Sequence, residues 1–161
     1  MEIRKAAMAD FDSIWPIFHT VIATGTTYPY SPATTKKQAR HIWMEVPLAT
    51  YLAEEAGQTL GTYYIKPNQP ELGAHICNCG YMVAPEARGQ GLGRMLCLHS
   101  QDRARTLGFF AMQFNLVVST NTVAVRLWQQ LGFSRIGTIP QAFNHKEYGL
   151  VDAYIMHRQL M

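Results

Sequence analysis

The chain has 161 residues, 48% of them hydrophobic and 16% charged, which predicts one globular domain over residues 1–161. Its net charge of +3 includes no block of Lys and Arg, which argues against nucleic-acid binding but suits an anionic ligand. No apolar run approaches the roughly 20 residues that cross a bilayer, so no membrane partner is expected. Three cysteines argue against a disulfide framework. Because Glu2, Arg4 and Lys5 interrupt any apolar start, we expect no signal peptide and a cytoplasmic location.

The first 65 residues predict a short strand, two helices and two further strands. Residues 2–6 could open a sheet, and from Asp10 to Ile22 apolar residues recur at helical spacing. Pro16 within this stretch predicts a kink unless it lies near the first turn. A second helix is expected over residues 35–45, with Thr34 or Thr35 as its cap. Segments rich in Tyr, Leu and Thr predict strands over residues 50–53 and 59–65.

An aromatic loop separates the two helices, because Tyr28 and Tyr30 stand among the prolines Pro29 and Pro32. Proline fixes the backbone, so this corner should be stiff. The two tyrosines either plug the core or form a wall of an acceptor site, and the sequence leaves both roles open.

The second half of the chain alternates strands and helices. Gly108 and Gly132 should end the two helices, and the strand between them is nearly all apolar and so buried on both faces. The expected strands are 74–84, 109–118, 133–139 and 150–158, with helices over 91–107 and 122–131 and a loop over 141–149. This order predicts an α/β fold with a mixed sheet.

A metal site at His75, Cys77 and Cys79 is disfavoured by strand geometry. The three side chains would share one face, but the outer two lie about 13 Å apart along a straight strand. Zinc bonds of about 2.0–2.3 Å cannot gather all three. We expect small buried thiols and no metal.

A glycine loop follows the strand 74–84, which Pro85 ends because proline has no N–H to donate. The loop runs Arg88-Gly89-Gln90-Gly91-Leu92-Gly93, and a helix follows it. Glycines allow a tight turn, and the first N–H groups of a helix have no partner within it. Free N–H groups and the helix dipole favour a phosphate here.

The spacing of this loop narrows the class of phosphate ligand. A P-loop needs Lys-Ser/Thr after its last glycine, whereas Arg94-Met95 follow here. A dinucleotide fingerprint needs a Gly-x-Gly-x-x-Gly spacing, which is also absent. The loop resembles the acyl-CoA loop of the GCN5-related N-acetyltransferases, in which Arg88, Gly91 and Gly93 fill the pattern Arg/Gln-x-x-Gly-x-Gly/Ala.

A second motif is similar to the other signature of this superfamily. It runs Asn121-x-x-Ala124-x-x-Leu127-Trp128-x-x-Leu131-Gly132-Phe133. The resemblance implies the fold of these enzymes: a mixed, mostly antiparallel central sheet, splayed between strands 74–84 and 109–118 and flanked by about four helices. Acetyl-CoA would lie in the splay, with its pyrophosphate on the N–H groups of residues 88–94 and its pantetheine on the backbone of two strand residues. The implied cofactor contacts are Met82, Val83, Arg88, Gly89, Gln90, Gly91, Leu92, Gly93, Arg94, Asn121 and Trp128.

A narrower resemblance, over residues 75–80, 112–121 and 124–129, is to the fungal azetidine-2-carboxylate N-acetyltransferases. It implies detoxification of a small proline analogue, with Asn78 and Asn115 holding the acceptor and Asn121 near the sulfur of the cofactor. The residues themselves agree, because Asn78 and Asn115 stand alone in two apolar strands and a buried unpaired amide costs about 1–3 kcal/mol. Tyr28 and Tyr30 join them as candidate substrate contacts. The alternative is that each asparagine only satisfies a loop or a bulge.

The chemistry requires an acid, a base and a donor for the oxyanion. Backbone N–H groups near Met82 and Val83 could hold the oxyanion. Trp128 occupies the position where many relatives have the tyrosine that protonates the leaving thiolate, and an indole cannot give up a proton at neutral pH. We therefore expect Asn121 to stabilise the sulfur, with Tyr154 as a fallback acid. A water held by Asn78 or by the second catalytic candidate, Asn115, is preferred as base over Glu86 or His145.

Two other functions remain open. The enzyme could acetylate another small amine, resembling an antibiotic or a herbicide, or the chain could bind acyl-CoA without turnover, as the missing tyrosine would suggest. The last strand and the apolar residues 139–143 could also pair with a second copy, so a homodimer is a further alternative.

Overall fold

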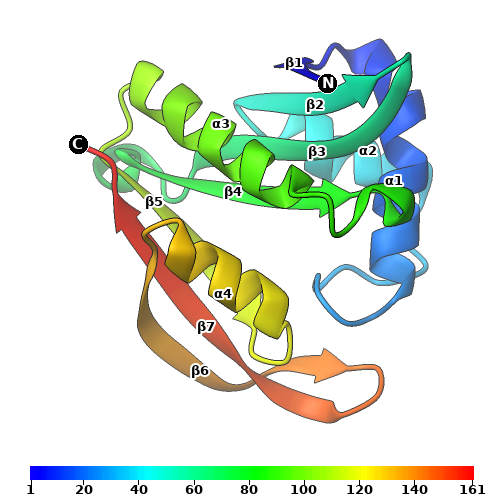
Figure 1. Cartoon of the computed structure of the whole chain (residues 1–161). Helices are drawn as coiled ribbons and strands as arrows, with labels where there is room; N and C mark the ends of the chain where they lie inside the picture. Colours follow the sequence, from blue (N-terminus) through cyan, green and yellow to red (C-terminus); the bar gives the residue numbers. More distant parts are fainter.

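The computed structural model describes all 161 residues as a seven-stranded sheet with helices on both faces (Figure 1). The strands lie in the order β1-β2-β3-β4-β5-β7-β6. Their bounds are β1 Glu2–Lys5, β2 Ala49–Glu55, β3 Gln58–Pro67, β4 Ile76–Val83, β5 Ala111–Val118, β6 Ser134–His145 and β7 Gly149–Gln159. The helices are α1 Phe11–Ala23, α2 Lys36–Arg40, α3 Leu92–Thr106 and α4 Thr122–Gln130.

The sheet is antiparallel except where β4 meets β5. That parallel contact consists of only two register pairs, Ile76 with Ala111 and Cys77 with Met112. Beyond Cys77 the two strands diverge, as Figure 1 shows. The predicted mixed sheet, splayed between these two strands, is therefore confirmed. The edge of β4 that faces the splay has no neighbouring strand over its second half.

Alternate residues of β3 and β4 point to opposite faces of the sheet. On one face, the ring of Tyr63 lies 5.8 Å from the imidazole of His99 in α3, and the hydroxyl of Tyr81 is 2.7 Å from Ser100 Oγ. On the other face, Tyr64 packs edge-on against Trp43, which follows α2. Helices α3 and α4 thus cover the near face in Figure 1, and α1 and α2 cover the far one.

Helix α1 passes through Pro16 without ending there. Pro16 cannot donate to the carbonyl of Asp12, but both residues are exposed, so water can satisfy that carbonyl. The opposite side of the helix buries Ile14, Phe18 and Ile22, and this packing holds the helix together.

The second helix begins as expected and ends differently. Thr35 caps α2 by accepting a hydrogen bond from the N–H of Gln38, and the side chain of Gln38 accepts one from the N–H of Thr35. The helical path continues to Glu45, but residues His41–Glu45 form a π-helical turn. Its side chains include the fully buried Trp43.

The predicted loop over residues 141–149 is wrong at its start. Strand β6 continues to His145, and only residues 146–148 turn. The pairing with β7 slips between Ile139 and Phe143, and Gln141 adopts a φ of 50°. Because the Gln141 N–H donates to Asp152 Oδ1 instead of to the ladder, the segment is a bulge within a strand.

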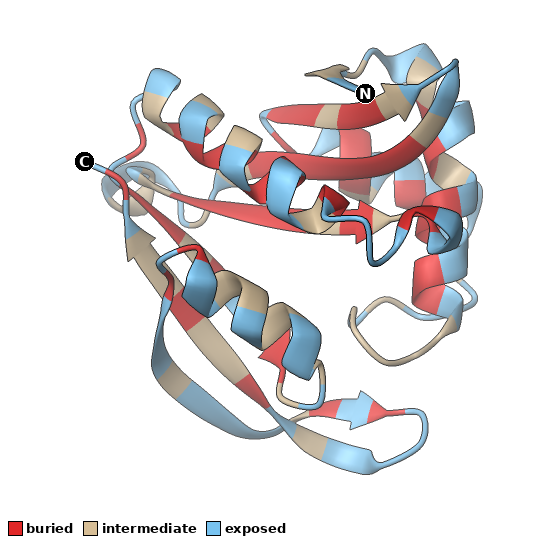
Figure 2. Ribbon diagram, in the orientation of Figure 1, coloured by how far each residue is buried: buried red, intermediate tan, exposed pale blue.

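Burial is concentrated in the central strands and the inner faces of the helices (Figure 2). The three cysteines are free and buried, as predicted. Strand β6 is largely exposed along the edge of the sheet. None of the helices is long and apolar enough to cross a membrane.

Candidate active site

The glycine loop presents a row of free backbone donors. Gly89 and Gly91 have φ values of 72° and 80°, and a side chain built on either would meet no atom within 4 Å. The N–H groups of residues 89 to 94 find no acceptor in the protein. The Arg88 N–H differs from this expectation, because it donates to the Pro85 carbonyl at 3.3 Å. Six consecutive donors at the start of α3 therefore remain for an anion such as a diphosphate.

Two arginines belong to the same stretch as these donors. The side chains of Arg88 and Arg94 are exposed, and neither forms an ion pair. Helix α4 lies close by, since a side chain on Gly93 would contact Leu127 at 3.5 Å. The free N–H groups of residues 89–94 therefore form a cradle for an anion. Helix α4 bounds this cradle on one side, and the cradle is open at Gly89 and Gly91.

The unpaired edge of β4 supplies a second set of backbone groups. The Ala84 N–H donates to the Leu60 carbonyl, and the register pairs Met82 with Thr62. Because bonding alternates along antiparallel strands, the polar groups of Met82 face β3, while those of Tyr81 and Val83 face the splay. The backbone groups free for the expected pantetheine and oxyanion contacts are therefore those of Tyr81 and Val83, and not those of Met82.

The hydroxyl of Tyr28 lies on this edge. It donates to the Tyr81 carbonyl at 2.7 Å and accepts from the Tyr81 N–H at 2.8 Å. Its ring stacks on Tyr30 and meets Trp43 edge-on. The rings thus pack on the core, as one of the two expectations had it, and the Tyr28 hydroxyl also reaches the splay; a role as a wall of the acceptor site stays a prediction.

Asn78 lies at the vertex of the splay and is 7% exposed. Its Oδ1 accepts from the Tyr64 hydroxyl at 2.9 Å, and its Nδ2 donates to the Gln113 carbonyl of β5 at 3.0 Å. That carbonyl can only accept, which fixes the orientation of the amide. Gly80 makes this possible, because a side chain there would lie 2.6 Å from the Tyr64 ring. Asn78 thus bridges the strands just where their ladder ends.

Asn115 lies on β5 in an exposed position. Its Nδ2 donates to Asn68 Oδ1 at 2.6 Å, and its Oδ1 accepts from Gln113 Nε2 at 3.0 Å. The pairing of β5 with β7 slips between Phe114 and Val117, so Asn115 stands at a bulge. Asn78 therefore links β4 to β5, and Asn115 links β5 to Asn68 at the end of β3.

The residues expected near the sulfur of the cofactor come from α4. Asn121 Oδ1 accepts from the Ala124 N–H at 3.3 Å and caps the helix, while its Nδ2 has no protein partner. The ring of Trp128 lies 5.2 Å from that of Tyr81 and 5.0 Å from that of Phe114. Trp128 thus joins α4 to both strands of the splay.

Three other candidate residues, Glu86, His145 and Tyr154, have contacts of their own. Glu86 accepts from the side chain of Gln58 on the exposed surface. His145 is buried, and its Nδ1 accepts from the N–H groups of Glu147 and Tyr148, so a loop uses its lone pair. The ring of Tyr154 lies under the guanidinium of Arg135. No hydrogen bond joins any of the three to Asn78 or Asn115, and their roles as base or acid stay predictions.

The structure adds two residues that sequence reasoning missed, Tyr64 and Tyr81. Burial raises the pKa of both hydroxyls and of the Tyr28 hydroxyl, so all three are neutral at pH 7 and donate hydrogen bonds without acting as bases. The signal for Tyr64 was Gly80 on the neighbouring strand, since an isolated strand glycine often marks a close approach.

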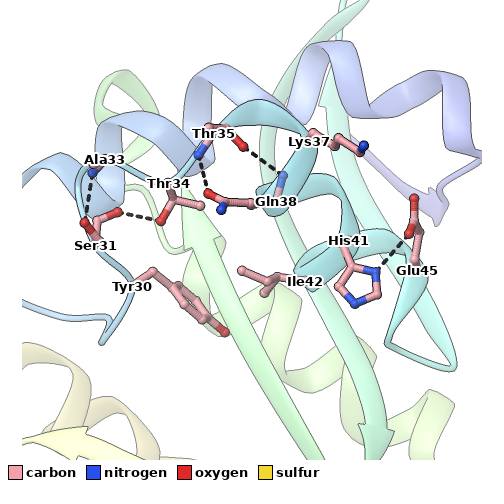
Figure 3. Close-up of a pocket in the computed structure, with 10 residues that line it drawn as sticks. All are labelled: Tyr30, Ser31, Ala33, Thr34, Thr35, Lys37, Gln38, His41, Ile42 and Glu45. Carbon is pink, nitrogen blue, oxygen red and sulfur yellow. Dashed lines mark hydrogen bonds and ion pairs between the residues drawn. The ribbon is translucent and has the colours of Figure 1, made fainter.

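A surface cavity of about 990 Å³ adjoins the aromatic loop (Figure 3). Tyr30, Ala33 and Ile42 contribute its apolar part, and the hydrogen-bonded pair His41 and Glu45 lies on the π-helical turn. Neither the glycine loop nor the asparagines line it. It therefore lies next to the splay, beyond Tyr30, and not in it.

Comparison with known proteins gives consistent results. Residues 11–133 match the model of the Acetyltransferase (GNAT) family. N-acetyltransferase aca1 of Schizosaccharomyces pombe is 38% identical over 83% of this chain and 72% of its own length. A GCN5-related N-acetyltransferase from Kribbella flavida shares 47% identity and superimposes with a TM-score of 0.93 over 98% of this chain and 96% of its own.

The fold is also that of yncA from Salmonella typhimurium, solved with its cofactor acetyl-CoA. The two chains are 24% identical, with a TM-score of 0.86 over 100% of this chain and 94% of yncA. At this identity the likeness concerns the fold alone.

Proposed function

Because the chain belongs to the Acetyltransferase (GNAT) family, acetyltransferases whose co-substrate is acetyl-CoA, we propose that its acceptor is a small amino-acid-like amine. A toxic proline analogue such as azetidine-2-carboxylate is the specific candidate. The observation that supports it is the asparagine pair: Asn78 and Asn115 bridge the splay beside the unpaired edge of β4. Amides can meet both the amine and the carboxylate of an amino acid.

The cofactor would bind along the elements just described. Its diphosphate meets the N–H groups of residues 89–94, with Arg88 and Arg94 beside it. Its pantetheine adds to the edge of β4 at Val83, like a further strand. The thioester then reaches the level of Tyr81, whose N–H can donate to the carbonyl oxygen once the Tyr28 hydroxyl moves aside.

The reaction consists of one attack and one departure. The neutral acceptor amine attacks the thioester carbonyl, and the Tyr81 N–H stabilises the oxyanion. The C–S bond then breaks, and Asn121 Nδ2 donates to the departing thiolate. Water takes the proton of the amine and returns one to the sulfur, because burial raises the pKa of the Tyr28 and Tyr81 hydroxyls, which makes them poor proton donors, and Trp128 has no proton to give.

A panel of amines tests the acceptor. Purified protein is incubated with acetyl-CoA and azetidine-2-carboxylate, proline, phosphinothricin or an aminoglycoside, and free thiol is measured. Azetidine-2-carboxylate should give the highest kcat/KM. A higher value for the herbicide-like or antibiotic-like amines would replace the proposed acceptor.

One observation favours a second candidate, an acyl-CoA-binding module without turnover. Trp128 stands where many relatives have an acidic tyrosine, and the hydroxyl of the neighbouring Tyr81 is already hydrogen-bonded with Ser100 Oγ. This candidate predicts binding of acetyl-CoA by calorimetry and no thiol release with any amine. The same panel therefore separates the two functions.

The cellular setting extends the proposal. We place the protein in the cytoplasm, where it would detoxify the acceptor. A homodimer through edge strand β6 and its hairpin is supported by the exposed side chains Ile136, Ile139, Tyr148 and Leu150. Light scattering should give a mass near twice the chain mass of 18.2 kDa.

A further inference from the structure

Lys66 stands among the polar groups at the vertex of the splay. It pairs in register with Asn78, and its Nζ lies 5.2 Å from the centroid of the Tyr64 ring. Tyr64, Lys66 and Asn68 alternate along β3 and its end, so they share one face. That face holds the Tyr64–Asn78 hydrogen bond and the Asn68–Asn115 hydrogen bond. Lys66 is therefore the cation of the asparagine cluster.

The charge of Lys66 is not neutralised by the protein. None of the ion pairs in the structure includes it. Strands β3, β4 and β5 contain no Asp or Glu at all. Because the ammonium is only half-buried and rests on an aromatic ring, it can turn toward an incoming anion.

The neighbouring amides have donors to spare. Asn78 Nδ2 uses one of its two hydrogens on the Gln113 carbonyl, and Asn115 Nδ2 uses one on Asn68. Each has a second N–H. A cation beside two amide donors, with no acid among them, suits a carboxylate.

We propose, on the basis of the acetyltransferase function above, that Lys66 binds the carboxylate of the acceptor and selects amino acids over plain amines. Although Lys66 pairs in register with Asn78, its Nζ reaches along the strand to the ring of Tyr64, which pairs with Gly80, the neighbour of Tyr81. An α- or imino acid whose carboxylate lies near Lys66 can therefore direct its amine toward the thioester at Tyr81. The acceptor class is thus a small amino acid with a free carboxylate.

A paired-substrate experiment tests this role. The acceptors are azetidine-2-carboxylate and its carboxamide, which have nearly the same shape, but the carboxamide has no negative charge and has an NH₂ group in place of one oxygen. Lys66→Met keeps the aliphatic stem over Tyr64 and removes the ammonium. It should raise KM for the carboxylate by about 10- to 100-fold, as expected for a lost charged hydrogen bond, and change kcat and the carboxamide KM less than about twofold. Lys66→Arg should restore most of the carboxylate KM.

The control is Lys5→Met, which removes an exposed lysine from edge strand β1 and should change nothing. Equal use of carboxylate and carboxamide by the wild type would overturn the role of Lys66 while leaving an acetyltransferase intact. An equal effect of Lys66→Met on both acceptors would also overturn it. Calorimetry of azetidine-2-carboxylate with the protein–CoA complex is independent of turnover: binding that Lys66→Met abolishes supports the inference, and no binding to the wild type refutes it.

Discussion

Asn121 uses one end of its amide for stability and leaves the other end free. Its Oδ1 caps α4, and its Nδ2 has no protein partner. Replacing Asn121 with Ala should therefore remove two functions at once. Because serine also caps helices, Asn121→Ser should retain the cap and lose only the donor.

We predict that Asn121→Ala lowers the free energy of unfolding by about 1 kcal/mol, whereas Asn121→Ser changes it by a few tenths. Both should lower kcat by about 10-fold or more, because each loses a hydrogen bond to the thiolate. Thermal unfolding and thiol release measure the two effects. An unchanged kcat in Asn121→Ser would show that the amide does not assist the leaving group.

Tyr28 and Tyr30 form a matched pair for a second prediction. Their rings stack, but only the Tyr28 hydroxyl bonds the edge of β4. Tyr28→Phe should destabilise the free protein by about 1 kcal/mol and tighten acetyl-CoA binding several-fold, since the cofactor no longer displaces a hydroxyl.

Tyr30→Phe should change neither quantity, because its hydroxyl forms no hydrogen bond to the protein. Denaturant unfolding and calorimetry with acetyl-CoA give both numbers. Weaker cofactor binding in Tyr28→Phe would mean that the hydroxyl contacts the cofactor instead of competing with it.

Sequence reasoning located the polar side chains better than it located their partners. Asn78 could be identified because it interrupts an apolar strand, yet its bonds to Tyr64 and to the Gln113 carbonyl depend on the register of three strands. The same register turns the backbone N–H and C=O groups of Tyr81, and not those of Met82, toward the open edge of β4. A shift by one residue would exchange them, and no local pattern fixes that register.

The helix that begins at Leu92 depends on two left-handed glycines. Gly91 is its N-cap, with a φ of 80°. Any other residue there is strained by about 1–2 kcal/mol and would change the direction of the N–H groups beside it. The function expected of this loop thus depends on its backbone conformation more than on its side chains.

We predict that Gly91→Ala raises the Kd for acetyl-CoA by at least about 10-fold, corresponding to loss of about one good hydrogen bond. Gly57→Ala is the matched control: Gly57 has a φ of 76° in the β2–β3 turn and equally open space around it. It should lose similar stability with no change in Kd. Equal Kd values for the two variants would contradict the proposed diphosphate cradle.

The elements themselves were largely predictable, with one informative exception. Helical periodicity located α1, α3 and α4 within a few residues. The sequence predicts too short a strand β6, because Pro140 and the polar residues after it are typical of a loop. The pairing of β7 across a bulge overrides that local signal, and only the tertiary structure reveals it.

The whole molecule is two half-sheets joined at a narrow vertex. Strands β1–β4 form one side and β5–β7 the other, with two register pairs and the Asn78 and Asn115 bridges between them. Family resemblance predicted this splay, but composition and periodicity could not, because an apolar strand looks the same whether its neighbour pairs with it or diverges. A ligand seated in the splay would bridge both halves.

Acetyl-CoA should therefore stabilise the molecule as a unit. At about 100 times Kd, a ligand that binds only the folded state contributes about 2.7 kcal/mol, which corresponds to about 5–10 °C in Tm for a chain of this length. Hydrogen exchange should slow at the N–H groups of residues 89–94, which have no protein acceptor, and at Val83 on the open edge. At the same concentration, Gly91→Ala should show a smaller shift and Gly57→Ala the full one. If the Tm rose equally in both variants, or if protection fell outside the splay, the cofactor would bind elsewhere on the protein.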